Sequence, residues 1–392
     1  MQVDGERALA AAAEADAALA RDEPTGPLHG VPFTAKDNLS AAGVEMAVGA
    51  PERAGVVPDT DATAVARLRG AGGVLLGKTN CPPYGGGIET DNEVYGRTNN
   101  PWDLERTPGG SSGGEAAAIA AGCSPCGVGT DSGASVRLPA HFCGLASIKP
   151  TSGLVPVTGV IDDLGQIGAL GDPRTQVGPL ARTVADVALL LGVLGGPDGR
   201  DGGAPPVPLG DPAAVSLRGL RVAATAENGL ASPTAETVEM VSRAAEALSD
   251  AGAAVSDARH PGGGHELTID VWRSYGEGVS AGELYSILRR WDAFRSEMLA
   301  WGERFDVIVC PVFAGPAPRH GETAVPGELD PTSYTTPSSL TGWPSATVRC
   351  GTSPEGLPLD VQVIAKPWRD HVALAVALEL ELALGGWAPP PI

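Results

Sequence analysis

Serine and glycine are concentrated between Thr107 and Gly144, a stretch that holds a single histidine, His141. Within it, Gly109–Gly114 (GGSSGG) and Gly129–Ser135 (GTDSGAS) each combine serine with glycine. Small residues let backbone N–H groups converge into a site for an anion or oxyanion beside a hydroxyl. Each loop alone also suits an ordinary turn, but together they indicate acyl chemistry, in which a serine attacks a carbonyl without a histidine base.

Lysine is scarce, which shortens the search for a group that could take the serine proton. Of the 27 lysines and arginines, only Lys36, Lys78, Lys149 and Lys366 are lysine. An arginine guanidinium keeps its proton in proteins, whereas a buried lysine can lose its own. A base other than histidine therefore has few candidates in this chain.

Two other motifs match the sequence patterns of known sites but lack the structural context that those sites require. Gly72–Thr79 fits the phosphate-binding pattern GxxxxGK[ST], but its middle positions are apolar and strand-like, and we expect Gly77 and Lys78 to lie beyond that strand. Gly110–Gly114 fits GxSxG, the nucleophile elbow, which requires a buried strand before the serine. The preceding segment, Glu105–Gly109, is not such a strand.

Composition and charge exclude several classes of protein. A net charge of −20 repels the phosphates of nucleic acids, so we expect no nucleic-acid partner. No apolar run reaches the roughly 18 residues of a membrane span, and the start of the chain, with Asp4, is not a secretory signal. Six cysteines, including the pair Cys123 and Cys126, form neither a disulfide framework nor a complete zinc site. We expect a cytoplasmic protein without a metal.

Helical and strand-like segments alternate along the chain, which is typical of an α/β fold. The Pro- and Gly-rich stretch 195–219 also suits a domain linker, but the alternation continues after it, so we interpret it as a surface loop. The predicted helices are 6–21, 62–69, 115–121, 184–194, 234–250, 283–304 and 371–384, and the predicted strands are 74–76, 220–224, 254–256, 307–309 and 361–364.

The two loops together resemble the amidase signature family. The resemblance rests on GGSSGG at Gly109–Gly114, followed by Gly-Thr-Asp-x-Gly-x-Ser-x-Arg-x-Pro-Ala at Gly129–Ala140. Further similar segments are 29–38, 77–80, 96–102, 148–153, 177–182, 340–344 and 356–364. The resemblance thus covers nearly the whole chain.

This resemblance implies one α/β amidase signature domain over residues 1–392, with a large mixed central β-sheet covered by helices on both faces. It implies Ser135 as the nucleophile, Ser111 after a cis peptide bond as the bridging serine, and Lys36 as the base, with no cofactor. Lys36 follows the apolar residues 31–33, and burial favours the neutral amine that such a base needs.

The backbone N–H groups of Ser132, Gly133 and Ala134 are, by the same resemblance, the oxyanion hole. Ala134 stands where the family usually has glycine. If that position required a positive φ, alanine would cost roughly 1 kcal/mol. The geometry of the hole therefore depends on the backbone at Ala134.

Four further residues of the Gly/Ser stretch have supporting roles. We interpret Asp131 and Arg137 as holding the nucleophile loop, although an acid and a substrate clamp are alternative roles. Ser112 is a supporting residue next to the bridging serine. His141 is interpreted as a packing or hydrogen-bonding residue and not as a base.

The function implied is hydrolysis of a carboxylic amide to acid and amine or ammonia. Two alternatives stay open: the glutaminase-type subunit of a tRNA-dependent amidotransferase, and a biosynthetic relative that transfers the acyl group to another amine. The aromatic residues Trp272, Tyr275, Tyr285 and Trp291 predict a pocket wall that suits an apolar or aromatic acyl group.

The family has further helices before the segment that resembles 6–21, so the N-terminus is short or trimmed. Trimming exposes apolar surface, and a second copy of the chain is a candidate to cover it as a homodimer.

Overall fold

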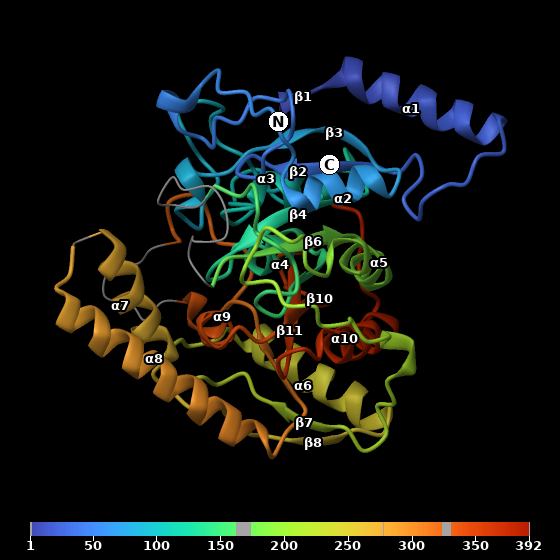
Figure 1. Ribbon diagram of the computed structural model, residues 1–392. Coiled ribbons are helices and arrows are strands. Elements are labelled where there is room, and N and C mark those ends of the chain that lie inside the picture. Colours follow the sequence, from blue (N-terminus) through green and yellow to red (C-terminus); the bar gives the residue numbers. More distant parts are fainter. Residues whose placement is uncertain (1, 162–173, 277, 324–330, 392) are drawn as a thin grey trace.

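One mixed β-sheet runs through the molecule (Figure 1). The structure is a computed structural model, and it describes residues 2–161, 174–276, 278–323 and 331–391. The eleven strands follow the order β1-β3-β2-β4-β6-β5-β10-β11-β9-β7-β8 across the sheet. Their bounds are β1 (Gln2–Val3), β2 (Pro32–Lys36), β3 (Val74–Thr79), β4 (Cys126–Asp131), β5 (Ala146–Lys149), β6 (Gln176–Ala181), β7 (Arg221–Ala224), β8 (Ala254–Ser256), β9 (Val307–Pro311), β10 (Ser345–Thr352) and β11 (Pro358–Ala365).

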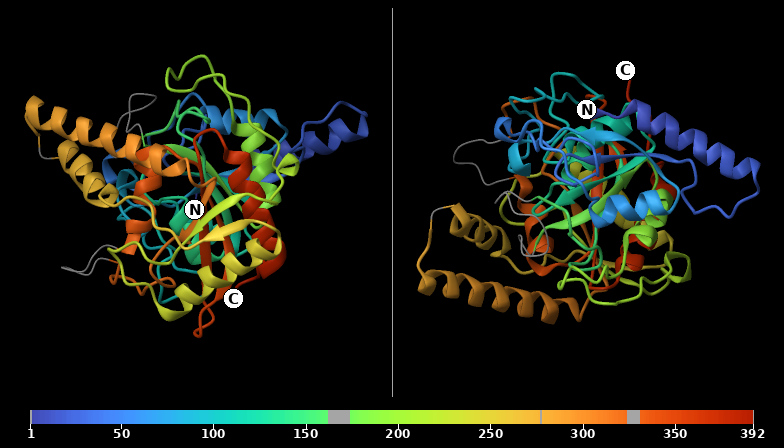
Figure 2. Two further views of the ribbon diagram at one scale, coloured as in Figure 1. Left: turned by 90° about the horizontal axis from the view of Figure 1, so that it is seen from below. Right: turned by 45° about the horizontal axis from the view of Figure 1, so that its top comes forward.

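Helices cover both faces of this sheet, as expected (Figures 1 and 2). Side chains of α2, α5, α6 and α10 belong to the largest hydrophobic cluster on one face, and those of α3, α4, α8 and α9 belong to clusters on the other. The described helices are α1 (Gly5–Ala20), α2 (Thr63–Gly70), α3 (Gly113–Ala120), α4 (Arg137–Cys143), α5 (Val184–Leu194), α6 (Ala235–Asp250), α7 (Gly264–Gly276), α8 (Ala281–Gly302), α9 (Thr336–Thr341) and α10 (Asp370–Leu384).

The side chains of strand β9 pack on both faces of the sheet. Successive side chains of a strand point to opposite faces of the sheet. Val307 and Val309 accordingly join the largest cluster, whereas Ile308 and Cys310 join the cluster under α7, α8 and α9. An uninterrupted apolar run is therefore what a strand covered on both sides needs.

The predicted elements are present, with two exact matches in α5 and β8. The stretch 195–219 leads into β7 of the same sheet, so it is a loop and not a domain linker. One expectation was wrong: Gly77 and Lys78 lie within β3 and not beyond it, because β3 continues its parallel pairing with β2 as far as Thr79.

Two parts of the chain project from opposite sides of the body, α1 on one side and the pair α7 and α8 on the other (Figure 2). Only Ala8 of α1 is buried. No helix in the described residues is long and apolar enough to cross a membrane.

Candidate active site

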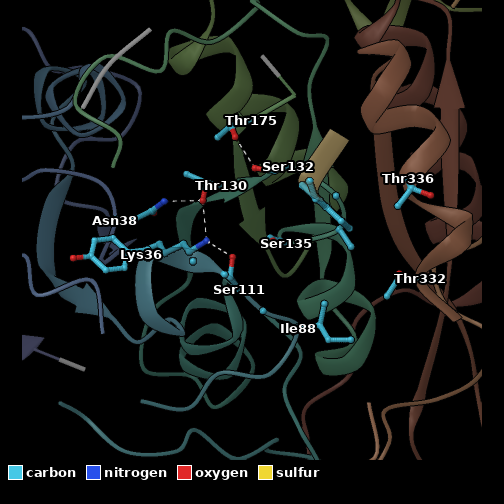
Figure 3. Close-up of a pocket in the computed structure, with 17 residues that line it drawn as sticks. Lys36, Asn38, Ile88, Ser111, Thr130, Ser132, Ser135, Thr175, Thr332 and Thr336 are labelled. Atoms are coloured by element: carbon cyan, nitrogen blue, oxygen red, sulfur yellow. Dashed lines mark hydrogen bonds between the residues drawn. The ribbon is translucent and has the colours of Figure 1, made fainter. Parts of the chain in front are cut away.

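The ends of β2 and β4 and the loop before α3 bring a lysine and two hydroxyls together (Figure 3). Lys36 is the last residue of β2 and is fully buried. Its Nζ lies 2.6 Å from Ser111 Oγ and 2.8 Å from Thr130 Oγ1. The peptide bond between Gly110 and Ser111 is cis. The sequence-predicted lysine and bridging serine are therefore in direct contact.

Glycine at position 85 lets a second loop pass close to this pair. Gly85 has a φ of +76°, a backbone conformation that other residues rarely adopt. A Cβ there would lie 3.5 Å from Ser111 Oγ and 3.6 Å from Lys36 Nζ. Both are ordinary contact distances, so the positive φ, and not a lack of space, is what favours glycine at position 85.

Burial makes Lys36 a weak base suited to neutral and mildly alkaline pH. Desolvation lowers the pKa of its amine to about 8, against the opposing effect of more distant acidic groups. The hydrogen-bond partners of its Nζ are hydroxyls and not carboxylates. A substantial fraction of Lys36 is therefore uncharged near pH 8, and only the uncharged amine can accept a proton.

Ser135 lies in the loop between β4 and α4 and faces the same cavity as Lys36 and Ser111 (Figure 3). The cavity holds about 410 Å³, and Ser135 is half-buried in its wall. Its hydroxyl makes no hydrogen bond with another residue of the described chain, and its carbonyl accepts one from the Ser112 N–H at 3.1 Å. Ser135 is thus the accessible hydroxyl of the pair, and Ser111 is the one joined to the lysine.

The three residues expected to form the oxyanion hole all line this cavity: Ser132, Gly133 and Ala134. The described non-glycine residues with a positive φ do not include Ala134. Alanine at this position is therefore unstrained. The hydroxyl of Ser132 lies 2.5 Å from Thr175 Oγ1, which ties the start of the loop to the residue before β6.

Asp131 and Arg137 fasten the ends of the Ser135 loop to each other. Arg137 donates from Nε and Nη2 to the two oxygens of Asp131, each at 2.9 Å, and also donates to the carbonyl of Gly133. Burial alone would raise the pKa of Asp131, but the Arg137 guanidinium lowers it overall. Both side chains are fully buried, and neither is among the described residues that line the cavity.

Arg137 also connects the loop to α9. Its Nη1 donates to Ser338 Oγ at 2.6 Å, and its Nη2 donates to Ser339 Oγ at 2.8 Å. The loop is therefore held from within by Asp131 and from outside by α9.

Ser112 and His141 lie outside the reacting group. Ser112 Oγ donates to the carbonyl of Thr130 at 3.3 Å and does not line the cavity. His141 accepts from the Asp360 N–H through Nδ1, and its Nε2 lies 3.0 Å from the carbonyl of Gly315. Burial lowers the pKa of His141 to about 4, so the imidazole is neutral and its two nitrogens are occupied. It has the packing and hydrogen-bonding surroundings expected from the sequence.

Three residues that shape the site were not singled out from the sequence. Thr130 accepts hydrogen bonds from both Lys36 and Asn38. Glu115 is buried below β2 and β3, where the hydroxyls of Thr34 and Thr79 bind its carboxyl group, and burial raises its pKa to about 7. Their positions in the sequence could have pointed to them. Thr130 and Asn38 belong to the quoted motifs, and Glu115 is the one acid in a helix of small residues.

Of the expected aromatic wall, Trp272 alone is shown to line the cavity. The expectation was wrong for Tyr285, which is 66% exposed on α8, and for Trp291, which lines a different cavity. Trp291 packs on the body beside α9 instead, where its Nε1 donates to the carbonyl of Leu340 at 2.6 Å. The side chain of Tyr275 lies outside the described residues.

Lys36 is the one charged residue among the described residues that line the cavity. The others are glycines, hydroxyl-bearing residues and Asn38, together with the apolar or aromatic side chains of Ile88, Tyr84, Ala134 and Trp272. In the same described part of the chain, His, Cys, Asp and Glu form no group of three that could hold a metal ion.

The chain matches a family model described as Amidase, over residues 1–281 and 274–374. A Glutamyl-tRNA(Gln) amidotransferase subunit from Moorella thermoacetica is 33% identical over 96% of this chain and 87% of its own length. The protein of the same name from Roseiflexus sp. (strain RS-1) is 38% identical over 78% of this chain. The match spans 60% of the Roseiflexus relative, and 44% of a further such relative from Chloroflexus aggregans.

Two solved structures are also similar to this chain. A bacterial aryl acylamidase of the amidase signature family superimposes with a TM-score of 0.87 and 26% identity, over 98% of this chain and 88% of that one. The corresponding Glutamyl-tRNA(Gln) amidotransferase subunit from Thermotoga maritima gives 0.83 and 28%, over 94% and 87%. The structure thus defines a class of protein. It has an α/β fold around one mixed sheet, with two serines and a buried lysine at one cavity. The chain belongs to the amidase family.

Proposed function

We propose that this protein hydrolyses an uncharged carboxylic amide to an acid and an amine or ammonia through an acyl-enzyme on Ser135. One observation supports this most strongly. The buried Lys36 lies 2.6 Å from Ser111 Oγ, and both line the cavity that Ser135 faces. A hydroxyl relay to a neutral amine can replace the histidine that this stretch lacks.

The proposed reaction moves one proton in each direction. Ser135 Oγ attacks the amide carbon while its proton passes to Ser111, whose own proton passes to Lys36. The carbonyl oxygen gains negative charge, which the backbone N–H groups of Ser132, Gly133 and Ala134 would stabilise. The protonated relay then returns a proton to the leaving nitrogen as the C–N bond breaks. Water attacks the ester by the same route and releases the acid.

The lining of the cavity supports an uncharged acyl group as the substrate class. A charged group enters a partly desolvated cavity at a large cost unless an opposite charge meets it. Apart from Lys36, the described lining residues carry no charge, and Trp272 and Ile88 offer apolar surface. We therefore propose an apolar or aromatic acyl group.

The names of the relatives favour a second candidate, the glutaminase-type subunit of a tRNA-dependent amidotransferase. Glutamine carries an α-ammonium and an α-carboxylate, and the described lining residues supply neither an acid nor a second cation for them. Turnover of glutamine that depends on a co-purified partner would favour this candidate.

We further propose that residues 1–392 act as one catalytic domain, in the cytoplasm, and that α1 forms part of a homodimer contact. Leu9 is 74% exposed and Leu19 is 60% exposed on this helix. Sedimentation of the wild type and of Leu9→Glu tests the contact, because a monomeric wild type would contradict it.

Trapping of the acyl-enzyme by mass spectrometry tests the central proposal. The panel consists of aryl amides, aryl esters, acetamide and glutamine, and peptide mapping locates the adduct. We expect an acyl adduct on Ser135 that Ser135→Ala abolishes. The matched control is Ser296→Ala, an exposed serine of α8 that does not line the cavity and should keep turnover. An adduct on another residue, or full activity of Ser135→Ala, would overturn the proposal.

A further inference from the structure

Trp272 lies directly against the loop expected to form the oxyanion hole. It belongs to α7 and lines the catalytic cavity. A Cβ added to Gly133 would come within 2.8 Å of Trp272 Cζ2, so only glycine leaves room for the indole at this distance. The indole therefore forms the cavity wall beside the place where an acyl group on Ser135 would lie.

A buried arginine lies over the face of this indole. Arg174 is 1% exposed, and its guanidinium carbon lies 5.3 Å from the centroid of the Trp272 ring and 6.0 Å from that of Trp291 on α8. A guanidinium over an indole face is attracted by the ring electrons, and more strongly when water is excluded. Arg174 thus joins both projecting helices, α7 and α8, to the body of the protein.

The residue that follows Arg174 contacts the same loop. Thr175 Oγ1 lies 2.5 Å from Ser132 Oγ, and β6 begins one residue later. The pair 174–175 therefore contacts the loop twice, once directly at Ser132 and once through the indole on Gly133. A rigid strand at its end gives this pair a defined position.

We propose that Arg174 is a positioning residue that selects flat acyl groups by holding Trp272 over Gly133. This inference rests on the proposed function, since it concerns the acyl group that Ser135 receives. Arg174 does not line the cavity, so it acts through Trp272 and not by contact with the substrate. With the indole held in place, a flat acyl group has a rigid surface to pack on, whereas a methyl group gains little from it.

Two sulfonyl fluorides measure this effect without knowledge of the natural substrate. Phenylmethanesulfonyl fluoride is the aryl probe and methanesulfonyl fluoride is the alkyl probe. In each case an O–S bond forms at Ser135 Oγ, the S–F bond breaks, fluoride leaves, and the serine proton passes to the relay. Intact-mass spectrometry gives the two labelling rates, and their ratio reports the acyl preference.

The variants form a double-mutant cycle on Arg174 and Trp272. We expect Arg174→Met to lower the aryl-to-alkyl ratio by about tenfold and Trp272→Ala to lower it by at least as much. The double variant should be no lower than Trp272→Ala alone, because Arg174 acts through the indole. The matched control is Arg182→Met, which removes a guanidinium 5.1 Å from the Trp387 ring, outside the cavity, and should leave the ratio unchanged.

The outcomes separate this inference from the proposed function. An unlabelled Ser135 in the wild type overturns the proposed function itself. A labelled wild type with an unchanged ratio in Arg174→Met, or additive losses in the double variant, overturns the role of Arg174 alone. If thermal melts show that Arg174→Met does not fold, Arg174→Gln replaces it with the same expectations.

Discussion

Two buried lysines lie on neighbouring strands and have opposite surroundings. Lys36 ends β2, and Lys78 lies in the parallel strand β3 beside it, both at most 1% exposed. Lys36 contacts hydroxyls, whereas Lys78 Nζ lies 3.4 Å from Asp37 Oδ1. Burial lowers the pKa of both amines, but a carboxylate opposes it at Lys78. The same burial therefore produces a candidate base at one strand and a structural ion pair at the next.

A turn at the end of β2 separates the two environments. Lys36 and Asn38 both contact the hydroxyl of Thr130, and Asp37 between them turns to Lys78 and to the N–H of Val48. Asp37 and Asn38 lie in the turn that follows β2, which the hydrogen bond from the Leu39 N–H to the Lys36 carbonyl closes at 3.0 Å. The carboxylate of Asp37 is thus directed to Lys78 and Val48 and away from the amine of Lys36.

The largest expected effect comes from Lys36→Met. Removal of the amine leaves the serine relay without a proton acceptor, and we expect kcat to fall by about 10⁴-fold. Since no carboxylate is left unpaired, the melting temperature should equal or exceed that of the wild type. Steady-state kinetics and calorimetry check both parts, and retained activity would show that another group is the base.

Lys78→Met is the matched contrast and should act on stability. It leaves Asp37 buried without its cation, which costs about 3–5 kcal/mol of unfolding free energy. The folded fraction should keep near wild-type kcat, and Lys78→Met combined with Asp37→Asn should recover part of the loss. Denaturant titration measures the change. Loss of activity at unchanged stability would contradict the claim that Lys78 has a structural role and not a catalytic one.

A smaller effect is expected from Thr130→Val, which removes a hydroxyl acceptor from Lys36 and Asn38. This hydroxyl favours the charged amine, so its loss should lower the pKa of Lys36 further and move the activity profile to lower pH. Because the amine is also less well oriented, we expect kcat to fall by about tenfold. A profile that moves to higher pH would contradict this account of the hydroxyls.

Short motifs predicted which residues meet at the site. The family resemblance, carried by Gly/Ser and Lys-Asp-Asn segments, implied roles for Lys36, Ser111 and Ser135, and the structure brings all three to one cavity. The helix α5 and the strand β8 follow from local apolar patterns alone. In each case the deciding residues are close together in the chain.

The rest depends on contacts between distant segments. The strands β2 and β4 contain Pro, Thr and Gly and lack a clear apolar pattern. Their side chains make polar contacts instead, from Thr34 of β2 to the buried Glu115 and from Lys36 of β2 to Thr130 of β4. The Gly127 backbone is closely covered by the Glu115 carboxyl group, where a Cβ would clash. Aromatic content likewise could not tell Trp272 from Tyr285, since the position of α7 and α8 on the body decides which ring reaches the cavity.

The pH dependence of kcat/KM for an uncharged amide tests the central claim most directly. If neutral Lys36 accepts the serine proton, kcat/KM should rise with pH to a plateau, with one inflection near the pKa of about 8 that burial gives this amine. The residual activity of Lys36→Met should lack that inflection, and Lys78→Met should retain it. A rate that is already maximal below pH 6, or an inflection that persists in Lys36→Met, would contradict the role of Lys36 as the base.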